Sequence, residues 1–188
     1  MKKLIPFIII TIILGTAIYI LSDPYFFTSA KTLYQLGIEK SDEGNDAIDV
    51  QGKRQAAEYF ERAIEKGYRD RNVYVKLYWA NIHIHSSDST IEEMLTDALE
   101  AYPNDSEFLF RRADSRLSQH KYELAIEDYS EVIKNGPDFQ YLHSAYYNRG
   151  AAKFILGKRE EAEKDREMAQ QLAPHQLRTY EDYSNLYK

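Results

Sequence analysis

Residues 106–137 read SEFLFRRADSRLSQHKYELAIEDYSEVIKNGP, and residues 143–174 repeat the order of their small, basic, acidic and proline positions 37 residues later. The matched pairs are Arg112 with Arg149, Ala113 with Gly150, Arg116 with Lys153, Leu117 with Phe154, Glu123 with Glu160, Ala125 with Ala162, Asp128 with Asp165, Val132 with Ala169 and Pro137 with Pro174. A fixed period of this size indicates one supersecondary unit stacked on copies of itself, because a single unit cannot bury its own apolar face. The stretch therefore predicts a repeat architecture.

Each unit reads as two short helices. In the first half, Leu109, Ala113 and Leu117 recur four residues apart after Asp105, which is a natural N-cap. The second half carries one apolar stripe at helical spacing, formed by Ala125, Tyr129, Val132 and Ile133. The dipeptide Gly136-Pro137 ends this helix, because glycine accepts a positive φ and proline cannot continue the hydrogen-bonding pattern.

These residues resemble the tetratricopeptide repeat, which has small residues at positions 8, 20 and 27, an aromatic residue at position 24 and proline at position 32. The residues at the structural positions of the two clear copies are Ala113, Ala125, Tyr129, Pro137, Gly150, Ala162, Ala169 and Pro174. Arg166 departs from the pattern, because it occupies position 24 of the second copy. The resemblance implies an all-α fold, a solenoid of about four helix-turn-helix repeats.

Weaker copies precede the two clear ones, so the units are expected at 28–70, 71–105, 106–139 and 140–174. In the second unit Trp79 falls at the small position 8, and a shift of one residue would put Ala80 there instead. The tail 175–188 is predicted to be a capping helix, since stacked repeats expose an apolar end. A frayed terminus is the alternative for this tail.

Residues 1–23 are predicted to form a transmembrane signal-anchor ahead of a repeat domain at 24–188. Leu4 to Leu21 is an uncharged stretch that reaches about 27 Å as a helix, enough to cross the hydrocarbon core. Lys2 and Lys3 precede it, which places the N-terminus in the cytoplasm and the repeats outside it, in a bacterial cell envelope. The alternative is a signal peptide cleaved near Gly15-Thr16-Ala17, which would release a secreted protein.

Charge and motif content bound the chemistry. Beyond the apolar stretch the chain carries 22 basic and 30 acidic residues, a net charge of −8, which disfavours nucleic acid as a partner. His83 and His85 are too close along a helix to share a metal ion, and the sequence has no cysteine. No nucleophile elbow, phosphate loop or zinc-binding motif occurs, so we expect neither an enzyme nor a cofactor.

The resemblance implies where a partner binds. In this family the first helix of each unit lines a concave groove for a peptide or partner helix. The corresponding residues are Glu107, Phe110, Asp114, Leu117 and Ser118 in one copy and Ser144, Tyr147, Ala151, Phe154 and Ile155 in the next. Phe110, Leu117, Tyr147 and Phe154 would form an apolar strip that anchors the partner, unless some of them pack on the tail.

Two further expectations concern specificity and stability. One branch of the family grips a carboxylate with lysine and asparagine at positions 5 and 9, and this sequence lacks that clamp. Asp128 and Arg149 both fall at the seam between two units, and we expect them to form an ion pair that fixes the stacking angle. The sequence thus predicts a membrane-anchored scaffold for a protein partner, with a secreted adaptor or a small-ligand or glycan-binding envelope protein as alternatives.

Overall fold

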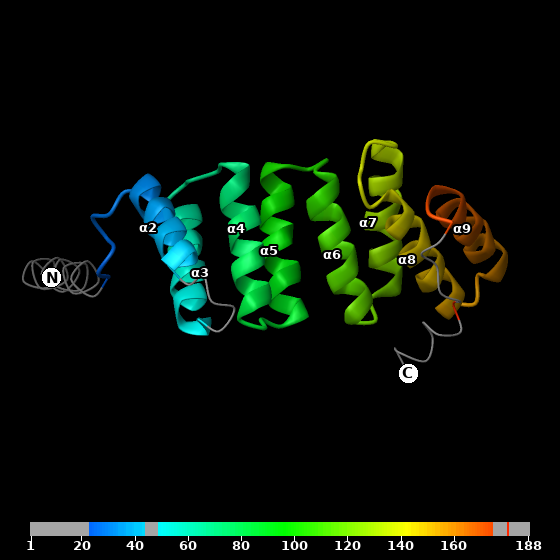
Figure 1. Ribbon diagram of the computed structural model, residues 1–188, viewed down its shortest axis with the longest axis horizontal. Coiled ribbons are helices and arrows are strands. Elements are labelled where there is room, and N and C mark those ends of the chain that lie inside the picture. The colour runs from blue at the N-terminus through cyan, green and yellow to red at the C-terminus, as the bar shows by residue number, and fades with distance from the viewer. Residues whose placement is uncertain (1–22, 44–48, 175–179, 181–188) are drawn as a thin grey trace, which may run out of the picture.

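A row of antiparallel helices makes up the described part of the chain, which comprises residues 23–43, 49–174 and 180 of a computed structural model (Figure 1). The elements are α2 (Ala30–Glu43), α3 (Val50–Glu65), α4 (Arg71–His83), α5 (Asp88–Ala101), α6 (Ser106–Ser118), α7 (Tyr122–Asn135), α8 (Leu142–Ile155) and α9 (Arg159–Leu172). These eight helices form four successive pairs, and no strand occurs in the described ranges. The fold is an all-helical solenoid.

Short polar side chains begin several of the helices. Asp105 caps α6 by accepting hydrogen bonds from the backbone N–H groups of Glu107 and Phe108, as the sequence predicts. Asp70 and Ser87 cap α4 and α5 in the same way. Gly136 ends α7 with a φ of 114°, a value that side chains with a Cβ rarely adopt. These capping residues and Gly136 therefore set where the helices begin and end.

Small residues bring the two helices of a pair close together. Ala113 and Ala125 are fully buried where α6 crosses α7, and Ala162 is buried where α9 crosses α8. In α4 the buried small residue is Ala80, with 4% of its surface exposed, whereas Trp79 is 43% exposed. The shifted register of the second unit is therefore the correct one, because an indole ring at the crossing would hold the helices apart.

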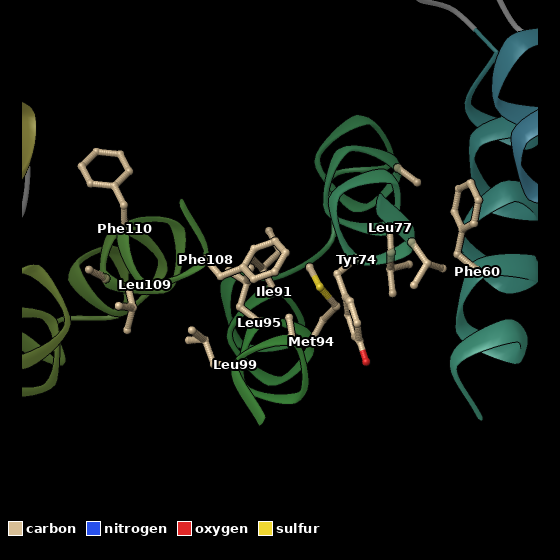
Figure 2. Packing of buried hydrophobic residues seen from close by; sticks show 14 of the residues in the cluster. Phe60, Tyr74, Leu77, Ile91, Met94, Leu95, Leu99, Phe108, Leu109 and Phe110 are labelled. Carbon is tan, nitrogen blue, oxygen red and sulfur yellow. The ribbon is translucent and has the colours of Figure 1, made fainter. Parts of the chain in front are cut away.

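The main core runs from α2 to α8 as a continuous layer between successive helices (Figure 2), and a smaller cluster of Ala151, Ala162 and Tyr180 lies at the end of the array. Tyr74 and Leu77 of α4 and Met94 and Leu95 of α5 belong to the main core, and Phe108 of α6 joins the next pair to this layer. The aromatic rings of Tyr74 and Phe108 lie 6.2 Å apart edge to face, a favourable geometry for aromatic contacts. Each pair thus buries apolar side chains both between its own two helices and against the neighbouring pairs.

The two terminal segments predicted to anchor and to cap the array fall outside this description. Among the described residues, no helix combines the length and apolar character needed to cross a membrane. The predicted anchor at Leu4 to Leu21 lies in residues 1–22, and the predicted capping helix lies in 175–188, of which the structure describes Tyr180 alone. Tyr180 is buried against α8 and α9.

Candidate interaction surface

The first half of the predicted apolar strip is covered from within the chain. Phe110 is 5% exposed, and its ring centroid lies 5.5 Å from that of Phe139 and 5.8 Å from those of Tyr129 and Tyr141. Figure 2 shows Phe110 on α6 projecting away from Leu99. Phe139 and Tyr141 come from the connection between α7 and α8. Leu117 is 2% exposed and belongs to the core.

The second half of the strip is covered by the tail. The ring of Tyr180 lies 5.2 Å from that of Tyr147 and 5.7 Å from that of Phe154, and its hydroxyl donates a hydrogen bond to the carbonyl oxygen of Ala162 at 3.2 Å. This burial raises the pKa of the Tyr180 hydroxyl well above its ordinary value. Phe110 and Leu117 are therefore buried, whereas Tyr147 and Phe154 are partly buried against Tyr180 of the tail, which is the alternative that the sequence left open.

The remaining predicted groove residues differ in their exposure and in their contacts. Glu107 accepts a hydrogen bond from Arg71 at 2.8 Å and joins two units. Ala151 is buried, and the structure leaves Ser144 and Ile155 partly exposed and Ser118 exposed. These residues do not converge on one pocket.

Asp114 is the predicted groove residue with the most unusual environment. Its Oδ1 atom accepts hydrogen bonds from the Tyr129 hydroxyl at 2.6 Å and from the Asn148 amide at 3.1 Å, so it bridges α6, α7 and α8. Burial raises the pKa of Asp114 to about 6, and the two hydrogen bonds and the Arg111 charge offset part of this rise. Asp114 thus fixes the seam between the third and fourth helix pairs.

An exposed cluster that the sequence reasoning missed lies beside Asp114. The guanidinium carbon of Arg111 lies 5.1 Å from the ring centroid of Tyr78, 5.4 Å from that of Trp79 and 5.7 Å from that of Tyr141. We call these four residues the arginine–aromatic cluster. It runs from α4 across α6 to the residue before α8, along the side of the solenoid formed by the first helix of each pair.

The arginine–aromatic cluster contains an unsatisfied donor. The Nε atom of Arg111 is buried and has no hydrogen-bond partner, the one such buried side-chain atom within the described ranges. Rings on its faces attract the cation, but they do not accept its in-plane N–H groups well. The sequence signal was the solitary tryptophan, which the register shift from Trp79 to Ala80 moves out of the core and into this surface.

The structure corrects the predicted ion pair between Asp128 and Arg149. Asp128 accepts hydrogen bonds from Arg112 at 2.8 and 2.9 Å, and Asp165 does the same from Arg149 at 2.6 and 2.9 Å. Each aspartate thus faces the arginine on the first helix of its own pair, because position 7 of one helix packs directly on position 23 of the other. The guanidinium reaches the preceding pair through a hydroxyl, since Arg149 also donates to Ser130 at 3.1 Å.

The described residues include no group of three or more His, Cys, Asp or Glu side chains that could hold a metal ion. One open hollow, of about 530 Å³, adjoins Phe154, Arg166 and Tyr180. A hollow of this kind suits a side chain of a partner better than an enclosed small molecule.

Comparison with known proteins agrees with this geometry. The model of the tetratricopeptide repeat family matches residues 92–138. Among curated proteins, none matches the sequence. A crystal structure of MamA superposes with a TM-score of 0.62 at 22% identity, over 90% of this chain and 86% of the other.

Two further solved structures are of similar shape. YrrB, described as a TPR protein with an unusual peptide-binding site, has a TM-score of 0.62 at 19% identity over 78% of this chain and 70% of the other. The first TPR of Spaghetti (RPAP3), bound to the HSP90 peptide SRMEEVD, has a TM-score of 0.51 at 15% identity over 66% of this chain and 95% of the other. At these identities the likeness is one of fold. The family match identifies a tetratricopeptide repeat at residues 92–138, and the helical solenoid extends on both sides of it.

Proposed function

We propose that the protein is a scaffold that binds a peptide or helix of a partner protein along the first helices of its repeats, and that it catalyses no reaction. The arginine–aromatic cluster is the centre of this surface. Two of the structural neighbours are described by their peptide binding, YrrB by its peptide-binding site and Spaghetti by its bound peptide. Their mode of use supports the class of function but not the identity of the ligand.

The observation that carries the proposal is the exposure of Trp79 beside the unsatisfied Nε of Arg111. A large exposed aromatic ring beside an arginine with an unsatisfied Nε–H group is a common arrangement at the centre of an interface. A partner that covers Trp79 and brings a carboxylate oxygen to the partly exposed Arg111 would bury the ring and pair the charge.

Site-specific photo-crosslinking in intact cells tests this proposal. A photoreactive amino acid is placed at position 79, and the matched control carries it at Glu131, an exposed residue of α7. We expect a discrete adduct from position 79 that is lost when Arg111 is changed to Gln, and none from position 131. The same adducts from both positions, or no adduct from position 79, would contradict the proposal.

We further propose that residues 4–21 tether the scaffold to a membrane with the repeats on the extracytoplasmic side. The uncharged apolar stretch and the two lysines before it support this proposal. Carbonate washing of membranes separates the tethered form from a secreted one, since a spanning helix stays in the pellet. Recovery of the full-length chain in the supernatant would contradict the tether.

A further inference from the structure

The fourth helix pair lacks the aromatic residue that its second helix should supply. In the third pair, Tyr129 of α7 is fully buried, with its ring 5.8 Å from Phe110. The 37-residue offset places Arg166 of α9 at the corresponding position, and Arg166 instead pairs with Glu163 on its own helix. Without a replacement, the face of Tyr147, which corresponds to Phe110, would be left uncovered.

Tyr180 supplies the missing ring from outside the pair. It is 4% exposed and packs on Tyr147 and Phe154, and its hydroxyl donates to the carbonyl oxygen of Ala162. Tyr129 covers Phe110 from within its own repeat, whereas Tyr180 covers Tyr147 from the tail. The place is therefore filled by a side chain whose backbone is not part of the helix pair.

Gly150 makes room for this ring. A Cβ atom at Gly150 would lie 2.0 Å from the hydroxyl oxygen of Tyr180, closer than any contact between non-bonded atoms. The corresponding residue of the third pair is Ala113, which carries a Cβ atom. The open hollow of about 530 Å³ continues from Tyr180 between Arg159 and Arg166. Room thus exists both for a tyrosine ring and for the segment that carries it.

We propose that Tyr147, Gly150, Phe154 and Ala162 form a binding site for a tyrosine side chain, the tyrosine socket, whose resting occupant is Tyr180 and whose exchanging ligand is a tyrosine-bearing segment of the partner protein. Two aromatic rings select an aromatic side chain, and the carbonyl oxygen of Ala162 selects a hydroxyl donor. The socket stands on its own contacts, whereas exchange with a partner rests on the proposed scaffold function.

The tail competes with any such partner. Because Tyr180 is tethered, its effective concentration at the socket is on the order of millimolar. A partner at a concentration below this value displaces it only by adding contacts elsewhere, and the open hollow and the arginine–aromatic cluster are the surfaces that offer them. The socket therefore discriminates between a single tyrosine and a longer segment that presents one.

Complementation in the full chain tests the socket. The probe is a fluorescent peptide with the sequence of residues 175–188, HQLRTYEDYSNLYK. By fluorescence anisotropy it should bind the Tyr180→Ala protein at least about tenfold more tightly than the wild type, whose socket is occupied. Adding Gly150→Ala to Tyr180→Ala should abolish binding, because the new Cβ fills the site. Equal binding to all three proteins, or none to Tyr180→Ala, would overturn the proposal.

Variants of the peptide probe distinguish binding in the tyrosine socket from non-specific binding. The peptide with Tyr180→Ala should fail to bind, and the matched peptide with Tyr183→Ala should bind as the parent does. A loss with both peptides, or with neither, would refute selection of Tyr180. Circular dichroism on each protein variant verifies that the helices are intact.

Limited trypsin digestion gives a readout that does not need the Tyr180 variant. Arg178 lies two residues before Tyr180, so release of the ring should speed cleavage after Arg178. Gly150→Ala in the full chain should raise that rate at least about tenfold, and excess peptide 175–188 carrying Arg178→Gln should raise it in the wild type. An unchanged rate with Gly150→Ala would overturn the socket. An effect of the variant without an effect of the peptide would overturn exchange alone, and the crosslink at position 79 reports on the scaffold function separately.

Discussion

Arg149 binds both carboxylate oxygens of Asp165, with Nε to Oδ2 at 2.9 Å and Nη2 to Oδ1 at 2.6 Å, and the pair is largely buried. Changing Arg149 to Met keeps the aliphatic stem and leaves the buried Asp165 with Lys153 as its remaining cation. We expect unfolding free energy to fall by about 3 kcal/mol, because an underpaired buried charge is costly. Urea denaturation followed by circular dichroism measures this loss.

The control for this prediction is Lys134→Met, which breaks the exposed pair with Glu131 and should cost less than about 0.5 kcal/mol. Equal losses for the two variants would show that burial does not govern the strength of these pairs.

Asp114 should make stability depend on pH. Its folded-state pKa of about 6 lies above that of the unfolded chain, so the folded protein holds the proton more tightly between about pH 4 and 6. The contribution of Asp114 to stability is therefore greatest at low pH and is lost as the pH rises through 6. Asp114→Asn should remove this dependence and stabilise the protein at pH 7 by up to about 3 kcal/mol.

The measurement for Asp114 is the difference in melting behaviour between Asp114→Asn and the wild type from pH 4 to 7, which cancels the other acids. Asp138→Asn in the exposed connection after α7 is the matched control. A difference that stays constant over this range would show that the carboxyl of Asp114 is not held by its surroundings as described.

Substitution of Phe110 should affect mainly stability, and substitution of Trp79 should affect mainly partner binding. Phe110→Ala removes a ring that packs on three others and should cost about 3 to 5 kcal/mol. Trp79→Ala removes an exposed ring and should change stability by less than about 1 kcal/mol while abolishing partner binding. Denaturation is read side by side with photo-crosslinking, in which the photoreactive amino acid is moved to Ile82, an exposed residue of α4 one turn after Trp79. A stable Phe110→Ala protein would mean that Phe139 and Tyr141 do not cover this ring.

Arg166→Tyr should restore the family pattern to the fourth helix pair. In the Tyr180→Ala background the new ring would lie where Tyr129 lies in the third pair and cover Tyr147. We expect the double variant to recover about 1 to 2 kcal/mol of the stability lost in Tyr180→Ala, as a buried aromatic contact does. Differential scanning calorimetry measures the recovery. No recovery would mean that the two tyrosines do not occupy equivalent places.

The repeat could be predicted from the sequence because the residues that define it meet local structural requirements. A close helix crossing demands a small side chain at Ala113 and Gly150, and Pro137 and Pro174 follow the end of a helix wherever they occur. These requirements act within a few residues, so spacing alone reports them. The partner of Asp128 could not be predicted in this way. Arg112 and Arg149 occupy the same position of two successive repeats, so the sequence pattern allows either, and the packing of the helices decides between them.

The candidate surface could not be predicted in the same way, because coverage of one side chain by another depends on segments without a repeat counterpart. Phe139 and Tyr141 lie in a longer connection that the neighbouring units lack, and Tyr180 lies beyond the last unit. The resemblance transfers positions within a repeat but carries no information on such additions. The exposure of Trp79 was missed for a different reason, which is the one-residue shift of the repeat register in the second unit.

Asp128 and Asp165 each find an arginine inside their own helix pair, whereas Arg71 pairs with Asp105 and Glu107 across a seam, and Arg116 does so with Glu92. Deletion of a whole unit would keep the pairs inside each remaining unit and would deprive a carboxylate at the seam of its cation. The ionic contacts between units therefore restrict which units evolution can remove or duplicate, and the contacts within a unit do not.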